Sequence, residues 1–174
     1  MSAELVKKLI NLHNCKKHNS NKLDKLKHVR SSVEFDLAIR YHLFMNLNPI
    51  KIFLLDDDVN FLEETKKTLV DEGYEVAICS RPTESIIAIR ELSPDCLVLD
   101  LRMPLFDGEA FLPWVRRQFP DLAVIVCTGK TDYDRELFSS LQVNHVIDKP
   151  FTTQFFIDTV ESAILEREAK RKVA

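Results

Sequence analysis

Polar residues of a few types end four of the apolar runs in this sequence, and their chemistry suits phosphoryl transfer. Asp56 and Asp57 follow one run and Asp100 another, while Thr128 and Lys149 end two more. Crowded carboxylates repel each other, so a dication among them favours their ionised form. Mg²⁺ prefers oxygen ligands and typically binds one or two carboxylates together with phosphate oxygens. These residues therefore predict a Mg²⁺ site at which a carboxylate accepts a phosphoryl group, whose oxygens an ammonium and a hydroxyl stabilise.

The elements that must position these residues alternate from residue 50 onward. Short apolar runs rich in Val and Ile predict strands buried on both faces: 50–55, 74–79, 96–99, 123–127 and 143–147. Amphipathic stretches between them predict helices at 59–72, 82–92, 108–118, 131–141 and 153–170. Asp58 is better explained as the N-cap of the first helix than as a metal ligand, and Gly73 as its C-terminal stop.

Five strand–helix pairs in succession predict an α/β fold, a flavodoxin-like (βα)5 doubly wound parallel sheet with strand order 2-1-3-4-5. In this order the ligand crevice lies at the carboxyl ends of the first and third strands, where the winding reverses. Asp56, Asp57 and Asp100 fall at those two ends. The predicted fold and the predicted chemistry therefore meet at one edge of the sheet.

Four segments, in order and correctly spaced, resemble the response-regulator receiver domains of two-component signalling over about residues 49–168. They are KIFLLDD (51–57), DCLVLDLRMPLFDG (95–108), VIVCTG (124–129) and DKPF (148–151). The resemblance implies that Asp100 is the phosphoacceptor and that Asp57 binds Mg²⁺ directly, with Asp56 as its partner, often through water. The backbone carbonyl of Arg102 would complete the protein's share of the metal shell.

The resemblance also implies roles at the last two strands. Thr128 would bond a phosphoryl oxygen. Lys149 would pair with Asp100 before phosphorylation and with the phosphoryl group after it, and its bond to Pro150 would be cis. Asp107 and Gly108 resemble the turn that follows the acceptor loop in that family.

Three positions depart from the family's usual pattern. Val146 stands three residues before the lysine, where the family usually has Tyr or Phe. Arg102 and Lys130 are basic at two positions that flank the phosphoryl group in similar proteins. We therefore expect a weaker aromatic switch, and an effect of the two basic residues on the lifetime of the phosphoryl group.

The start of the chain differs in charge from the rest. Residues 1–50 have nine Lys and Arg against four Asp and Glu, whereas residues 51–174 have fifteen against twenty-three. We predict a basic N-terminal extension at 1–48, helical or disordered, and a receiver domain at 49–171. Residues 1–44 are expected to be dispensable for folding, and Met45 is an alternative start. His13, Cys15 and His18 lack a fourth ligand nearby, and the basic stretch suits a solvated tail better than a nucleic-acid site.

The favoured hypothesis is a stand-alone phosphoacceptor response regulator, not an enzyme and without an output domain. Its expected partners are a histidine kinase or histidine phosphotransfer protein, an unidentified downstream protein and, as a candidate assembly, a second copy in a homodimer. We expect no nucleic-acid partner and no membrane, because no apolar run approaches the length of a span. Three cysteines in apolar runs favour the cytoplasm: Cys79, Cys96 and Cys127.

Two alternatives remain open. One is a Mg²⁺-dependent phosphatase of the haloacid-dehalogenase type, because residues 56–60 (DDDVN) come close to the DxDx[TV] pattern of that family. That family needs a further acidic pair late in the chain, and none follows Lys149. The other is a basic-arm nucleic-acid binder, which the acidic domain and the lack of a recognition motif weaken.

Overall fold

Five parallel strands form the centre of the structure. They are β1 (Lys51–Leu55), β2 (Glu75–Cys79), β3 (Cys96–Leu99), β6 (Ala123–Thr128) and β7 (His145–Asp148), in the order β2-β1-β3-β6-β7. Counted along the chain this is the predicted order 2-1-3-4-5, which is confirmed. The computed structural model describes residues 49–129 and 132–171. The predictions for residues 1–48 and for Lys130 lie outside that part.

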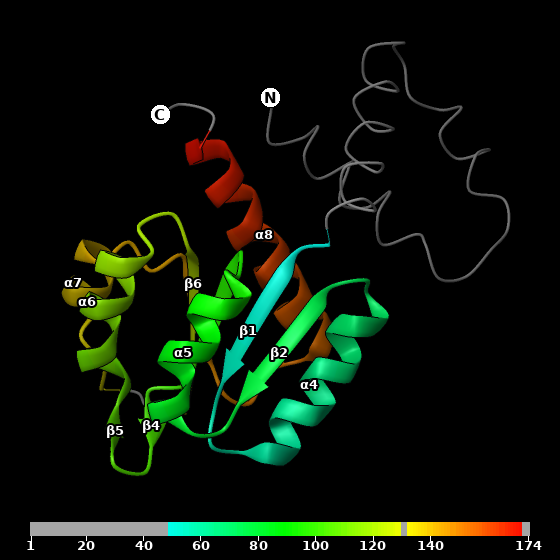
Figure 1. Cartoon of the computed structure of the whole chain (residues 1–174), viewed down its shortest axis with the longest axis horizontal. Helices are drawn as coiled ribbons and strands as arrows, with labels where there is room; N and C mark the ends of the chain where they lie inside the picture. Colours follow the sequence, from blue (N-terminus) through cyan, green and yellow to red (C-terminus); the bar gives the residue numbers. More distant parts are fainter. Residues whose placement is uncertain (1–48, 130–131, 172–174) are drawn as a thin grey trace, which may run out of the picture. The chain divides into compact units, whose positions relative to one another are not determined.

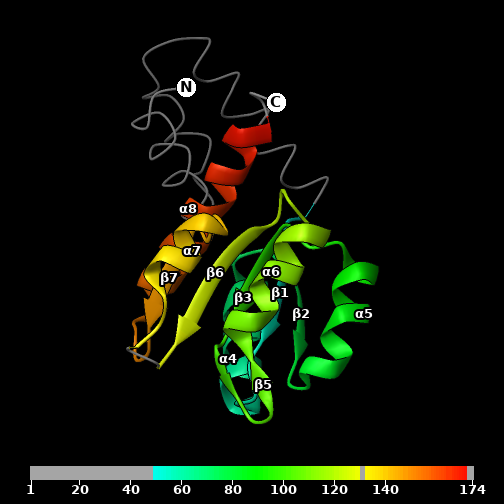
Figure 2. The same ribbon diagram turned by 90° about the vertical axis from the view of Figure 1, so that its left-hand side faces the viewer.

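Helices cover both faces of the sheet, as Figures 1 and 2 show. Two of them, α4 (Val59–Asp71) and α8 (Thr153–Arg171), pack on one face. The other three, α5 (Pro82–Leu92), α6 (Gly108–Gln118) and α7 (Arg135–Ser140), pack on the opposite face. This is the doubly wound arrangement that successive right-handed crossovers produce.

The alternation of side chains along β1 shows why the sheet is buried on both faces. Ile52 and Leu54 pack toward α4 and α8, and Phe53 and Leu55 toward the other three helices. All four are at most 1% exposed. Burying this much apolar surface on two sides fixes the register, because a slip of one residue would exchange the two faces.

Most predicted boundaries are right to within one or two residues, but the helix predicted at 131–141 is wrong at its start. Helix α7 begins at Arg135 because Asp134 caps it, its carboxylate accepting a hydrogen bond from the amide of Leu137 at 2.9 Å. The helix ends at Ser140, and Gln142 follows with a left-handed φ of 52°. Two capping signals thus shorten a stretch that periodicity alone makes longer.

A small hairpin between β3 and α6 was not predicted. Its strands β4 (Arg102–Met103) and β5 (Phe106–Asp107) pair antiparallel. In Figure 1 the hairpin lies at the lower edge, where the arrowheads of β1 and β2 also point. At its tip Leu105 has a φ of 59° and is fully exposed. The hairpin therefore extends from the edge of the sheet that holds the carboxyl ends of the strands.

An aromatic row connects the hairpin to α6. Phe106 packs edge-on against Phe111 with ring centroids 5.1 Å apart, and Phe111 stacks on Trp114 at 5.2 Å. The guanidinium of Arg90, on α5, lies 5.8 Å from the centroid of the Trp114 ring. The row links the hairpin to the surface between α5 and α6.

Candidate functional site

The predicted site residues all lie at the carboxyl edge of the sheet, and the sheet's hydrogen bonds hold them there. The amide of Asp56 donates to the carbonyl of Cys79 at 3.3 Å, and that of Asp100 donates to Leu55 at 2.9 Å. The amide of Lys149 donates to the carbonyl of Thr128 at 2.9 Å. Each residue therefore continues the ladder of a neighbouring strand, which leaves its side chain little freedom to drift.

Three carboxylates converge at this edge. One oxygen each of Asp56, Asp57 and Asp100 can be chosen so that all three lie within 4.8 Å of one another. Asp56 and Asp100 are buried, at 2% and 6% exposure, whereas Asp57 is exposed. A hard dication suits this set, because it takes oxygen ligands and completes its shell with water on the open side. The residues present therefore fit Mg²⁺.

An open hollow of about 550 Å³ lies beside the cluster. Asp57, Leu101 and the hairpin of β4 and β5 line it. The hollow opens to solvent on the side of the cluster where Asp57 is exposed.

Lys149 joins the two buried carboxylates. Its ammonium donates a hydrogen bond to Oδ2 of Asp56 and lies 3.6 Å from Oδ2 of Asp100. The resemblance implied a pair with Asp100, but the closer partner here is Asp56. The peptide bond between Lys149 and Pro150 is cis, as predicted.

Burial and the neighbouring charges in this cluster shift the pKa values of Asp56 and Lys149. Burial raises the pKa of Asp56 above its ordinary 3.8, and the hydrogen bond from Lys149 offsets only part of this effect. Burial alone would lower the pKa of Lys149, but its hydrogen bond to Asp56 and the negative charges of Asp56 and Asp100 raise it overall. The ammonium therefore stays charged, while the buried carboxylate at Asp56 favours a further cation.

Backbone amides fix the orientation of both buried carboxylates. The amide of Asp58 donates to Oδ1 of Asp56 at 3.0 Å, and that of Arg102 donates to Oδ1 of Asp100 at 3.2 Å. The side chain of Asp58 accepts hydrogen bonds from the amides of Asn60 and Phe61. Its predicted role as the N-cap of α4 is confirmed.

Thr128 and Arg102 complete the part of the site that the structure describes. Thr128, at the end of β6, is fully buried. The guanidinium of Arg102 lies 3.6 Å from the carboxylate of Asp132, with both side chains largely exposed. Val146, at the position usually aromatic, is half-buried on the face of α5, α6 and α7 and pairs in register with Val126.

Sequence reasoning assigned Gly108 only to a turn and did not include Phe61 in the site. A β-carbon at Gly108 would lie 2.7 Å from Cα of Leu101 and 2.8 Å from the carbonyl oxygen of Asp100, so only glycine fits against the acceptor loop. The ring of Phe61 lies 4.4 Å from Nζ of Lys149. Gly108 belongs to the LFDG turn already singled out in the sequence, but nothing in the sequence signals the contact between Phe61 and Lys149.

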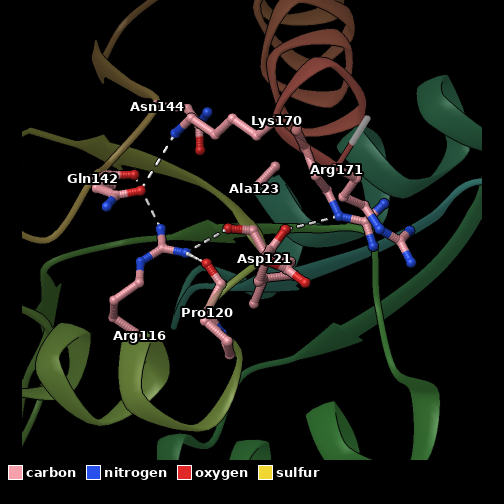
Figure 3. A pocket seen from close by; sticks show the side chains of 10 residues that line it. Arg116, Pro120, Asp121, Ala123, Gln142, Asn144, Lys170 and Arg171 are labelled. Carbon is pink, nitrogen blue, oxygen red and sulfur yellow. Dashed lines mark hydrogen bonds between the residues drawn. The ribbon is translucent and has the colours of Figure 1, made fainter. Parts of the chain in front are cut away.

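A second cavity, of about 330 Å³, lies at the opposite edge of the sheet (Figure 3). Arg116 closes one side of it by donating hydrogen bonds to main-chain carbonyls, those of Phe119, Pro120, Leu122, Leu141 and Gln142. Arg167 on its other side bonds Asp95 at 2.8 Å and the carbonyl of Asp121 at 2.9 Å. Because protein groups already engage both guanidiniums, we interpret this cavity as a structural clasp, in which Arg116 joins α6 to the loops before β6 and β7 and Arg167 joins α8 to the segments before β3 and β6.

The fold and this cluster define a receiver, and comparison with known proteins agrees. The family model for the response regulator receiver domain matches residues 52–161, and the chain belongs to that family. The solved receiver domain of a CheY-like protein from Methanospirillum hungatei superposes with a TM-score of 0.66 at 24% identity, over 71% of this chain and 99% of that one. The non-phosphorylated receiver domain of HemR from Leptospira biflexa gives 0.62 at 27% identity, over 67% and 94%.

Curated relatives are longer proteins. The DNA-binding transcriptional regulator NtrC of Salmonella typhimurium is 29% identical over 114 residues, which is 65% of this chain and 24% of the relative. The DNA-binding response regulator MtrA of Mycobacterium tuberculosis is 30% identical over 115 residues, 66% of this chain and 50% of the relative. The chain thus matches between a quarter and half of their length. Among its described residues, no helix is long and apolar enough to span a membrane.

Proposed function

We propose that this chain is a phosphoacceptor switch in a two-component relay, with Asp100 as the accepting residue. One observation carries the proposal. The carboxylate of Asp100 is buried at the switch point of the sheet, within 4.8 Å of oxygens from Asp56 and Asp57 and 3.6 Å from the Lys149 ammonium. A carboxylate that lies between two further carboxylates, which can hold a dication, and a lysine ammonium suits the acceptance of a phosphoryl group.

The reaction we propose is a phosphoryl transfer from a phosphohistidine. An oxygen of Asp100 attacks phosphorus, the P–N bond of the donor breaks as the new P–O bond forms, and the released imidazole takes up a proton from solvent. The product is an acyl phosphate on Asp100. Mg²⁺ held by Asp56, Asp57 and the carbonyl of Arg102 would neutralise charge on the transferring group.

This chain's own residues supply orientation and charge. The amide of Arg102 holds one oxygen of Asp100 and leaves the other to attack. Lys149 starts between Asp56 and Asp100 and needs only a small movement to reach a phosphoryl oxygen. We expect Thr128, buried at the end of the next strand, to donate its hydroxyl to the same group. Alignment and neutralisation of charge supply most of what phosphoryl transfer requires.

The partners follow from the same proposal. The donor is a histidine kinase or a histidine phosphotransfer protein, and the product signals by binding a downstream protein in the cytoplasm rather than by catalytic turnover. The receiver match supports this hypothesis over a phosphatase of the haloacid-dehalogenase type. The relatives named as DNA-binding extend well beyond the part that this chain matches, so the absence of a nucleic-acid partner stays a prediction.

Acetyl phosphate with Mg²⁺ tests the proposal directly. We expect one phosphoryl group per chain, detected by intact mass, and its loss in hydroxylamine, which cleaves acyl phosphates. Asp100→Asn should abolish labelling, and Asp57→Asn should raise the Mg²⁺ concentration needed. Asp107→Asn is the matched control, because Asp107 is an exposed N-cap of α6 near the same hollow. Equal labelling of the Asp100→Asn protein would refute the assignment.

A further inference from the structure

Phe61 places an aromatic ring against the lysine of this site. It lies in the first turn of α4, and its ring centroid is 4.4 Å from Nζ of Lys149. The face of an aromatic ring attracts a cation at such distances because of the ring's quadrupole. The same ammonium bonds Asp56, so Asp56 and Phe61 hold the cation from two directions.

Contacts of both the backbone and the ring hold Phe61 in place. Its amide donates to the carboxylate of Asp58 at 3.1 Å, and the amide of Asp58 in turn donates to Asp56. Its ring packs edge-on against Phe151 at 6.0 Å, and Phe151 stacks on the buried ring of Phe156 at 5.3 Å. The backbone of Phe61 is therefore linked through Asp58 to Asp56, and its ring packs on aromatic residues that reach the core under α8.

We propose that Phe61 is a positioning residue for Lys149, and that its ring holds the ammonium at Asp56 and so opposes its transfer to a phosphoryl group on Asp100. This inference rests on the proposed phosphoacceptor function and concerns the regulation of that site. The asymmetry of Lys149, hydrogen-bonded to Asp56 but 3.6 Å from Asp100, is the arrangement that such a contact favours.

The consequence is a bias between two states. A contact made in one state and lost in the other shifts the equilibrium by its full interaction free energy. If Lys149 leaves the ring when it moves to the phosphoryl group, removing the ring makes the phosphorylated arrangement easier to reach. A residue with only a packing role would have the opposite effect or none.

Beryllofluoride, which stands in for the phosphoryl group on Asp100, provides the test. With Mg²⁺ present, we expect Phe61→Leu to bind it roughly three- to tenfold more tightly than the wild type, because the cation–π contact is gone. Phe61→Tyr keeps a ring face and should restore wild-type affinity. Phe155→Leu is the control, because Phe155 is an exposed phenylalanine on α8, outside the ring contacts of the described chain. Unchanged or weaker binding by folded Phe61→Leu would overturn the inference.

A second measurement needs no variant. The ring current of Phe61 should shift the ε-methylene protons of Lys149 upfield in the resting protein, and beryllofluoride should remove that shift. An upfield shift that persists in the complex would overturn the inference while leaving phosphoacceptance intact. Failure of the wild type to bind beryllofluoride at all would instead refute the proposed function, and this inference with it.

Discussion

Lys149 and Asp56 come from strands at opposite sides of β3 and β6, yet they form the closest ion pair in the crevice. The ammonium is also 3.6 Å from Asp100, so one cation faces two buried carboxylates. A metal ion at the cluster would compete with Lys149 for the same oxygens. This competition connects metal binding, the position of the lysine and the stability of the fold.

The raised pKa of Asp56 gives the metal-free protein a defined pH dependence. A carboxyl whose folded pKa is raised contributes stability that is complete below its unfolded pKa, near 3.8, and is lost as pH rises through the folded pKa. In EDTA, the wild type should therefore lose free energy of unfolding relative to Asp56→Asn over that window. Urea unfolding at a series of pH values measures the difference. With saturating Mg²⁺ the trend should reverse, because the ion favours the ionised carboxylate. A wild type that gains on Asp56→Asn as pH rises in EDTA would contradict the assignment.

Gly108 should be intolerant of a β-carbon. Gly108→Ala places a methyl group 2.8 Å from the carbonyl oxygen of Asp100, so the acceptor loop must shift. We expect a loss of roughly 1–3 kcal/mol in the free energy of unfolding, with slower labelling by acetyl phosphate. Gly129→Ala is the control, because a β-carbon there meets nothing within 4 Å. Equal effects of the two substitutions would show that the close approach has no consequence.

We expect that glycine can replace Leu105 without lowering the stability of the fold. Its left-handed φ of 59° is unfavourable for a side chain that is fully exposed and buries nothing. Leu105→Gly should leave stability unchanged or raise it by up to about 1 kcal/mol. Ile87→Gly, at an exposed position in α5, should instead cost about 1 kcal/mol. Thermal unfolding of both compares them, and a clear loss at Leu105 would indicate a packing role for its side chain.

Arg116 should contribute far more to stability than its neighbour Arg117. Its guanidinium satisfies several main-chain carbonyls in the clasp of Figure 3, and a methionine there would leave them without a donor. Arg116→Met should cost about 2–4 kcal/mol. The exposed Arg117→Met should change the free energy of unfolding by less than about 0.5 kcal/mol. Similar midpoints in urea for the two variants would show that solvent replaces Arg116.

We expect the conformational change on phosphorylation to involve little repacking around Val146. This side chain is too small to fill an aromatic slot and has no polar tip, so one usual difference between the two states is missing. Amide shifts on adding beryllofluoride should centre on the loops after Asp100 and Thr128 and on Phe61. Large shifts centred on Val146 and α8 would show that another residue has taken over the aromatic's role.

The sequence was sufficient to predict features that depend on local patterns of residue types. The apolar runs have strand length and are buried on both faces, so the order of the sheet and the convergence of Asp56 and Asp100 followed from periodicity and topology. The start of α7 was missed because the cap at Asp134 outweighs a helical pattern that extends further back. The β4–β5 hairpin is too short to show any alternation.

Contacts between distant elements were not accessible in the same way. Phe61 meets Lys149 only because the first turn of α4 lies beside the residues that follow β7, and no spacing in the sequence encodes that distance. The hydrogen bond of Lys149 to Asp56 rather than to Asp100 likewise depends on side-chain positions to within an ångström.

The aromatic row beside the crevice has a practical consequence. Trp114 is the only tryptophan in the chain, and its ring is stacked on Phe111, which contacts Phe106 next to Asp107. A displacement of the hairpin would reach the indole through two ring contacts. We therefore expect the emission intensity and wavelength of Trp114 to change when the crevice is occupied, which would allow occupancy to be followed in real time without an added label.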